Sequence, residues 1–157
     1  MKLKTIIEED FSNYKKPSML IAFPTCSFKC DKECGLKICQ NSHLSNSPII
    51  EISYDNIIKK YLNNNLTEAI VFGGLEPFDS LKDLYLLVNA FRLYTDDDIV
   101  IYTGYYPNEI TKQIKQLKQY PNIIIKFGRF IPNQEHHMDE VLGVELASPN
   151  QYAVKIS

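Results

Sequence analysis

The residues of this chain with the clearest chemical potential are its four cysteines, which all lie in one stretch, residues 24–41. They are Cys26, Cys30, Cys34 and Cys39. Thiolates are soft ligands, and the objects that select them are zinc, copper(I) and iron–sulfur clusters. Four thiols scattered by chance over 157 residues would rarely fall within one loop, so the stretch predicts a site that grips one small object.

Three interpretations of this cysteine loop compete. Disulfides suit short secreted chains, whereas this N-terminus turns acidic at Glu8-Glu9-Asp10 before the apolar core of a secretory signal could form. The pairs Cys26/Cys30 and Cys34/Cys39 could together form a structural zinc site, although the two pairs of such a site are commonly set farther apart. An iron–sulfur cluster needs only thiolates from a flexible loop, and we favour it. The spacing alone leaves open whether three or four thiols bind.

A second stretch with chemical potential is Gly73-Gly74-Leu75-Glu76-Pro77. Its two glycines expose backbone amides and carbonyls to a ligand, and Glu76 adds a carboxylate. The stretch lacks the lysine of a phosphate-binding loop, and its carboxylate would repel phosphate. A cationic or amine-bearing ligand fits better. The competing interpretation is a tight turn between a strand and a helix, with no ligand at all.

Length and composition limit the classes of protein to consider. The sequence predicts one domain, residues 1–157, large enough to bury a core. A formal net charge of -2 argues against a general affinity for nucleic acid, and no apolar run approaches the length of a membrane span. We therefore expect a cytoplasmic, reducing location, where free thiols are more often ligands than bridges.

The apolar runs of the chain predict the frame that must position these residues. Residues 18–23 form a nearly continuous apolar run that stops at Pro24, a pattern typical of a strand buried on both faces. Further strands are predicted over residues 68–72, 98–102 and 122–127, with extended pieces at 49–52 and 152–156. Helices are predicted from Ser53 to residue 62, from Asp79 or Ser80, and from Pro107. Residues 129–150 look irregular, and His136-His137 within them is read as a solvated pair.

Alternation of strands and helices with short links predicts an α/β fold with a mostly parallel sheet. The carboxyl ends of parallel strands share one edge, which is where α/β folds place their sites. The cysteine loop follows the first of these strands, and a glycine follows each of the next three: Gly73, Gly104 and Gly128. We therefore expect the cysteine loop and the glycine turns to meet at this edge.

With both stretches placed, the chain resembles the radical S-adenosylmethionine enzymes, and among them the small activating proteins of anaerobic ribonucleotide reductase, the glycyl-radical activases. The resemblance covers nearly the whole chain and includes Tyr102-Thr103-Gly104-Tyr105 after the third strand and Ser148-Pro149-Asn150-Gln151 near the end. It implies a single-domain partial (β/α) barrel that carries a 4Fe-4S cluster on three cysteines. The fourth iron is left open for the methionine end of S-adenosylmethionine.

Two departures from the family pattern affect the site. The family loop is Cys-x3-Cys-x2-Cys, and here Cys26-x3-Cys30 is followed by Glu33 where the third cysteine would stand. Cys39-Gln40-Asn41 resembles the third cysteine and its trailing Asn, so the resemblance implies ligands Cys26, Cys30 and Cys39 with residues 31–38 inserted. Cys34 is kept as the alternative third ligand. The family turn Gly-Gly-Glu-Pro is extended here by Leu75.

The resemblance also implies roles for the remaining residues. Gly73, Gly74 and Glu76 would face the amino group of S-adenosylmethionine, and Thr103 and Gly104 would meet its ribose. No side chain receives a catalytic role, because the reduced cluster cleaves the cofactor to methionine and a 5′-deoxyadenosyl radical. That radical would take a hydrogen from a glycine of a large glycyl-radical enzyme of the anaerobic ribonucleotide reductase type, with flavodoxin or ferredoxin as electron donor. The alternative is a non-catalytic binding module that holds zinc or a cluster structurally.

Overall fold

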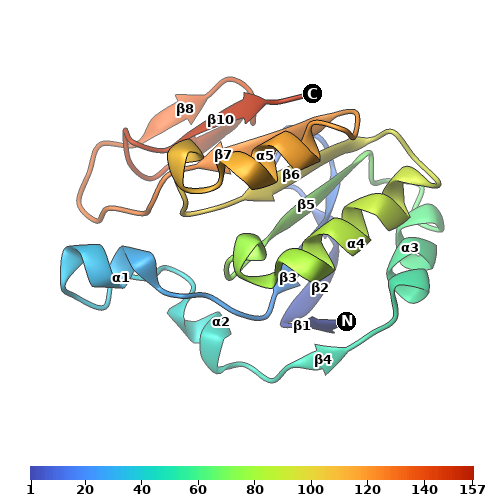
Figure 1. Cartoon of the computed structure of the whole chain (residues 1–157), viewed down its shortest axis with the longest axis horizontal. Helices are drawn as coiled ribbons and strands as arrows, with labels where there is room; N and C mark the ends of the chain where they lie inside the picture. The colour runs from blue at the N-terminus through green and yellow to red at the C-terminus, as the bar shows by residue number, and fades with distance from the viewer.

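The protein is described by a computed structural model that covers residues 1–157 and centres on a six-stranded sheet of order β10-β7-β6-β5-β3-β2 (Figure 1). Its strands are β2 (Thr5–Asp10), β3 (Ser18–Phe23), β5 (Ala69–Gly74), β6 (Asp98–Tyr102), β7 (Ile123–Phe127) and β10 (Tyr152–Lys155). The four central strands are parallel, whereas β2 and β10 pair antiparallel at the two edges. This confirms a mixed α/β fold with a largely parallel sheet, and the sheet does not close into a barrel.

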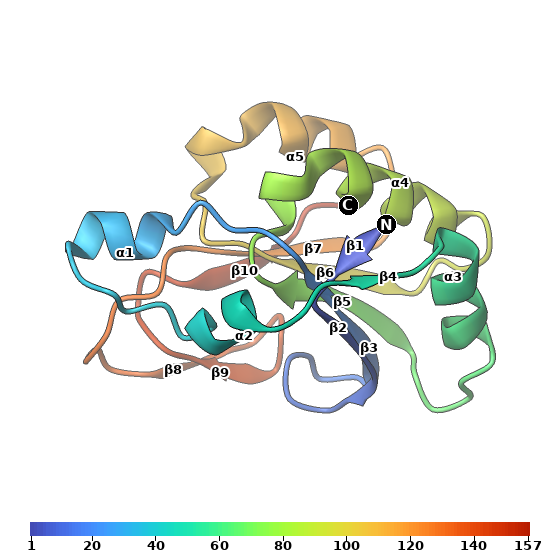
Figure 2. The same cartoon turned by 90° about the horizontal axis from the view of Figure 1, so that it is seen from below.

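Three helices cover one face of the sheet, as Figure 2 shows for α4 and α5. They are α3 (Tyr54–Leu62), α4 (Leu81–Arg92) and α5 (Thr111–Leu117). The predicted cap of the first helix is confirmed, because the Ser53 hydroxyl accepts the Asn56 amide. The apolar stripes of the helices pack on alternate strand residues such as Phe72 and Ile101, which forms a core of 21 buried residues.

The other face of the sheet is covered by a smaller cluster of eight buried residues. Part of its cover is a short antiparallel hairpin of β8 (His137–Asp139) and β9 (Val144–Leu146). The sequence analysis expected residues 129–150 to be irregular, and the hairpin corrects this expectation. Asp139 fixes it to the sheet, since its carboxylate accepts the amides of Leu142 and Ala153, both at 2.9 Å. Strands this short carry no readable alternation.

The N-terminal part of the chain adds strands that the sequence analysis did not predict. They are β1 (Lys2–Leu3) and β2, which forms one edge of the main sheet. β1 pairs antiparallel with β4 (Ile50–Glu51), which lies in the extended piece predicted over residues 49–52. The remaining short elements are α1 (Lys29–Cys34), α2 (Ser42–Asn46), η1 (Pro77–Ser80) and η2 (Pro107–Glu109). No helix has both the length and the apolar character that a membrane crossing requires.

Candidate metal centre

A cavity of about 710 Å³ lies at the carboxyl ends of the parallel strands and continues along the face of the sheet that the helices leave free. Its lining includes eight of the nine residues assigned from the sequence: Cys26, Cys30, Cys39, Gly73, Gly74, Glu76, Thr103 and Gly104. Cys34 is exposed and lies outside it. The two stretches that were singled out in the sequence therefore meet at one edge of the sheet.

The inserted residues 31–38 explain how Cys39 reaches the cavity. They continue α1, which ends at the exposed Cys34 and is closed by Gly35 in the left-handed conformation. The chain then folds back, and the Asp31 carboxylate accepts the amides of Ile38 at 2.9 Å and Cys39 at 2.8 Å. Both ends of the insertion are thereby joined at one side chain, and Cys39 returns beside the other two thiols.

The three thiols that line the cavity share one electrostatic environment. Burial raises the pKa of Cys26 to about 12 and also raises the pKa values of Cys30 and Cys39. A backbone amide opposes this effect at each sulfur, and the Phe28 amide donates to the Cys26 sulfur at 3.2 Å. A metal must displace the thiol protons, after which these amides stabilise the thiolates.

The arrangement of the thiols bears on what they can hold. All four cysteines are free, so the structure contains no disulfide. No group of three or more His, Cys, Asp and Glu side chains converges closely enough to hold a single metal ion. Structural zinc draws four ligands around one ion, whereas an iron–sulfur cluster distributes its thiolates over separate irons. The thiols that line the cavity are therefore compatible with a cluster, which does not need its thiolates to meet at one ion.

The glycine turn is held directly against the cysteine loop. Asn41 donates its side-chain amide to the Gly74 carbonyl at 2.6 Å, and the Glu76 amide donates to the Thr25 carbonyl at 2.8 Å. Gly74 has a φ of +79°, and a Cβ there would lie 2.6 Å from the Cβ of Ala22. Glycine is required by both constraints. The two glycines form the end of β5 itself, whereas the sequence analysis placed them after the strand.

Glu76 is buried and held by three donors. Its carboxylate accepts Thr103 Oγ1 at 2.8 Å, the Gly104 amide at 2.8 Å and the Phe78 amide at 3.1 Å. Burial raises its pKa to about 7, although all three hydrogen bonds act in the opposite direction. Thr103 and Gly104 were expected to meet a ribose, and in the structure their donors orient this carboxylate. A Cβ on Gly104 would lie 3.6 Å from the Cys30 sulfur, so the missing side chain leaves room beside that thiol.

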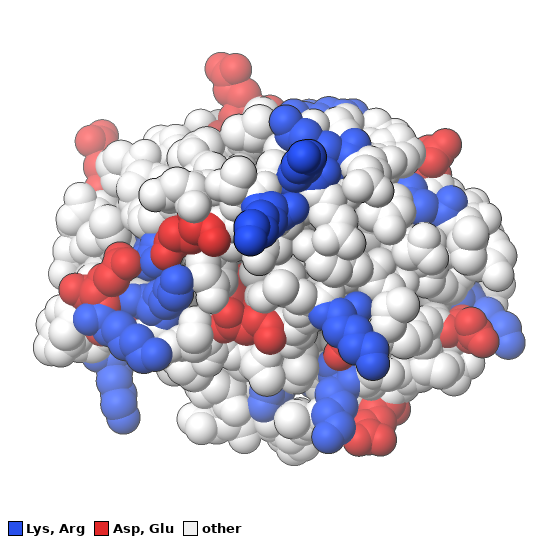
Figure 3. Space-filling view, in the orientation of Figure 1, with Lys and Arg blue, Asp and Glu red and all other residues white.

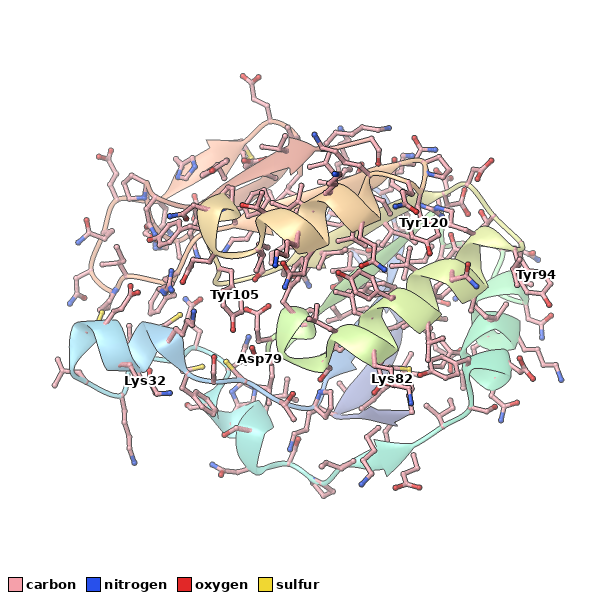
Figure 4. The ribbon with its side chains drawn as sticks, viewed as in Figure 1. Lys32, Asp79, Lys82, Tyr94, Tyr105 and Tyr120 are labelled. Atoms are coloured by element: carbon pink, nitrogen blue, oxygen red, sulfur yellow. The ribbon has the colours of Figure 1, made fainter.

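Hydrogen bonds through Asp79 connect the cysteine loop to the turn after β6. Tyr105 and Asp79 point toward one another in Figure 4, and the tyrosine hydroxyl donates to the carboxylate at 2.6 Å. The other oxygen of Asp79 accepts the Ser27 amide at 2.5 Å, inside the cysteine loop. The turn after β6 is thereby connected to the residues between the first two thiols.

An ion-pair network that the sequence analysis missed anchors α1. The nearly buried Arg129 binds Glu109 with two hydrogen bonds of 2.7 and 2.9 Å and pairs with Glu33 at 2.9 Å. Lys29 pairs with Glu109 as well, and the Arg129 contact is the main reason that the pKa of Glu109 falls to about 2. Figure 3 shows acidic and basic side chains gathered together over this part of the molecule. No sequence spacing connects these positions, so only the fold reveals the network.

Two further side chains of the cavity were not assigned from the sequence. Lys126 is buried at the end of β7, and Gln151 lies beside it, with both side chains turned to the Gly128 carbonyl. The lysine within the apolar run of β7 could have drawn attention to Lys126, and the segment Ser148-Pro149-Asn150-Gln151 that carries the family resemblance includes Gln151. His136, read as solvated, is exposed as expected, but it pairs with Glu145 at 2.8 Å and both line the outer part of the cavity.

These observations fit an iron–sulfur cluster. Three half-buried thiols line one cavity, each sulfur faces a backbone amide, and Gly104 leaves space next to one of them. The sequence model of a family described as "4Fe-4S single cluster domain" matches residues 18–151, which include the whole cavity edge of the sheet. Comparison with curated proteins and with solved structures gave no match. The chain therefore belongs to the 4Fe-4S single cluster domain family and is an iron–sulfur protein.

Proposed function

We propose that this protein is a radical S-adenosylmethionine enzyme that generates a glycyl radical on a partner such as anaerobic ribonucleoside-triphosphate reductase. The observation that supports this most is the shared cavity of three thiols and one buried carboxylate, with the fourth thiol outside. Cys26, Cys30 and Cys39 would hold a 4Fe-4S cluster with three thiolates, which would leave one iron without a protein ligand. That is the arrangement a cofactor-activating cluster needs.

The residues of the chain have separate tasks in this proposal. The bound cluster and S-adenosylmethionine together supply the reductive cleavage that yields a 5′-deoxyadenosyl radical. Glu76, held by its three donors, presents its carboxylate edge to the amino group of the cofactor. Gly73 lies at the end of β5 and has no side chain, so it leaves space for the cofactor in the cavity. The walls position the cofactor and exclude water.

The size and edges of the fold favour a macromolecular substrate. A cavity of about 710 Å³ is in the range that encloses one cofactor-sized ligand. Little volume is left for a large second substrate, so the target glycine has to enter from a partner chain. We propose that the open sheet is the partial barrel of the activases and that the partner completes it. Flavodoxin or ferredoxin in the cytoplasm would supply the electron.

The alternative is a binding module in which a cluster or zinc has only a structural role. Such a module would use all available thiolates and would not need a buried carboxylate beside them. Cys34 lies outside the cavity, and Glu76 lies inside it. Both positions favour the enzyme.

Anaerobic reconstitution with iron and sulfide tests the proposal. The enzyme should turn brown with about four irons per chain, and it should release 5′-deoxyadenosine when given dithionite and S-adenosylmethionine. Addition of the reductase polypeptide should then produce a carbon-centred radical on that polypeptide, detected by electron paramagnetic resonance. A brown protein that releases no 5′-deoxyadenosine would support a structural cluster, and a colourless protein with one zinc would support the zinc module.

A further inference from the structure

The outer surface of the insertion, residues 31–38, has no part in the site described above. None of these residues lines the cavity, although Cys30 and Cys39 on either side of them do. In Figure 1, α1 lies at one end of the molecule, away from the three helices that cover the sheet. The insertion is therefore an outer surface of the protein directly beside two of the cluster ligands.

The charged side chains of the insertion are sorted by sign. Its two acids are engaged, since the Asp31 carboxylate accepts two backbone amides and Glu33 pairs with Arg129 at 2.9 Å. Its two lysines, Lys32 and Lys37, are exposed and take part in none of the ion pairs of the chain. The unpaired charges that the insertion presents to solvent are therefore both positive, in a chain whose net charge is -2.

An exposed apolar side chain lies between the two lysines in the sequence. Leu36 is 69% exposed, and it follows Gly35, which closes α1 in the left-handed conformation. The start of α1 is fixed, because Lys29 pairs with Glu109 at 2.9 Å and lies 4.2 Å from the centroid of the Tyr105 ring. An apolar side chain with unpaired cations beside it, on a fixed base, is suited to docking of an acidic protein surface.

The position of the insertion relative to the cluster indicates the kind of partner. α1 continues from Cys30 to Cys34, which corresponds to about 6 Å along the helix axis. A protein docked on the insertion would thus come close to the cluster. Electron transfer between proteins needs such an approach, because its rate falls steeply with distance. The cavity stays open at the same time, since no residue of the insertion lines it.

We propose that residues 31–38 form the docking surface for the electron donor of the cluster, a small acidic one-electron carrier protein. This inference rests on the proposed function, in which the cluster has to be reduced before the cofactor is cleaved. In this step the carrier is oxidised by one electron and the cluster is reduced by the same electron, and no bond forms or breaks. The competing partner for this surface is the reductase polypeptide that receives the radical.

The test measures the rate at which reduced flavodoxin, reduced ferredoxin or dithionite reduces the cluster, by anaerobic stopped-flow absorbance without S-adenosylmethionine. The proteins are the wild type, Lys32→Glu/Lys37→Glu and the control Lys82→Glu/Lys115→Glu. The control reverses two exposed, unpaired lysines on α4 and α5, so the net charge changes equally. At low salt we expect the insertion variant to be reduced by its protein donor about 10-fold more slowly or less, and the control within about 2-fold of the wild type.

Two further measurements separate charge from apolar contact. Dithionite should reduce all three proteins at similar rates, because it needs no docking surface. Added salt should slow the reduction of the wild type by the protein donor and have little effect on Lys32→Glu/Lys37→Glu, since it screens the attraction between exposed charges. Leu36→Ser should slow the protein donor at high salt as well, because the contact it removes is apolar.

The other outcomes separate the docking surface from the proposed function. Equal slowing by both double variants would show a general charge effect and overturn the docking surface, as would an unchanged rate in the insertion variant or a wild type that neither carrier reduces. Weaker binding of the reductase polypeptide with unchanged reduction by the carriers would assign the surface to the competing partner. The expected rates in a protein that releases no 5′-deoxyadenosine with dithionite and S-adenosylmethionine would support the docking surface and contradict the proposed enzyme. Equal iron content in all variants checks that the cluster is in place.

Discussion

The two faces of the central sheet divide the work of the molecule. On the helix-covered face, alternate residues such as Phe72 and Ile101 are large and apolar and join one core of 21 buried residues. On the other face, the residues at the carboxyl ends of the strands are small or polar, and they line the cavity: Ala22, Gly73, Tyr102 and Lys126. Because side chains alternate along a strand, one run of sequence builds both surfaces. Stability is concentrated on one face and chemistry on the other.

The largest effect that this comparison predicts is on the cavity face. Cys39→Ala should reduce the iron content of reconstituted protein from about four per chain to near zero. Cys34→Ala should leave it unchanged, because that thiol is exposed and outside the cavity. Iron and sulfide analysis with the optical spectrum measures both. A cluster that survives Cys39→Ala but not Cys34→Ala would show that the third ligand is Cys34.

On the helix face, Leu87→Ala should mainly destabilise the fold. Leu87 is fully buried in the 21-residue core, so its truncation should lower the free energy of unfolding by about 2–5 kcal/mol. Leu86→Ala on the same helix is the control, because Leu86 is 42% exposed and its loss should cost less than about 0.5 kcal/mol. Urea denaturation of the apoprotein measures both. If folded Leu87→Ala protein could not bind a full complement of iron, the separation of stability and chemistry between the two faces of the sheet would be wrong.

Glu76 should make the stability of the apoprotein depend on pH. Its pKa is about 7 in the folded chain and 4.5 in the reference state, so folding favours the protonated form. This contribution is fully present below about pH 4.5 and is lost as the pH rises through 7, a change of about 3 kcal/mol. Urea denaturation between pH 5 and 8 should show this slope in the wild type and a flatter one in Glu76→Gln. If the stability of the two proteins depended on pH in the same way, burial would not raise the pKa of Glu76 as stated.

The smallest predicted effect concerns the insertion in the cysteine loop. Asp31→Ala removes the acceptor for the Ile38 and Cys39 amides, which should weaken the closed loop by about 1–3 kcal/mol. We expect iron to be lost to a chelator about 10-fold faster or more, with little change in global stability. Lys32→Ala is the control, since Lys32 is exposed on the same helix (Figure 4). Equal rates of iron loss in the two variants would show that the loop is held by other contacts.

The sequence was sufficient for the elements that bury apolar runs. The predicted strands at residues 18–23 and 98–102 have the observed bounds, and Ser53 caps its helix as expected. The hairpin β8–β9 escaped prediction because its strands have three residues each and are fixed by Asp139, a contact distant in sequence. The sequence of a strand that is apolar on both faces also does not indicate which face of the sheet the helices cover.

The site shows the same division between local and distant information. The clustered thiols and the glycine turn lie in short stretches, so their types and spacing indicated that both belong to a site. The support of the site depends on Arg129, which joins Glu33 and Glu109 from separate parts of the chain. Lys126 was hidden for another reason: within an apolar strand a lysine reads as an edge residue until the cavity around it is known.

The carboxylate of Asp31 also bears on how such proteins are recognised. It joins the start of the insertion, residues 31–38, to its end. These eight residues between Cys30 and Cys39 can therefore protrude without moving the two thiols. The distance along the chain between the second and third thiol is then free to vary while their distance in space is kept. A search that relies on fixed spacings between cysteines would miss proteins built this way. A search that allows an insertion closed by hydrogen bonds to an aspartate would find them.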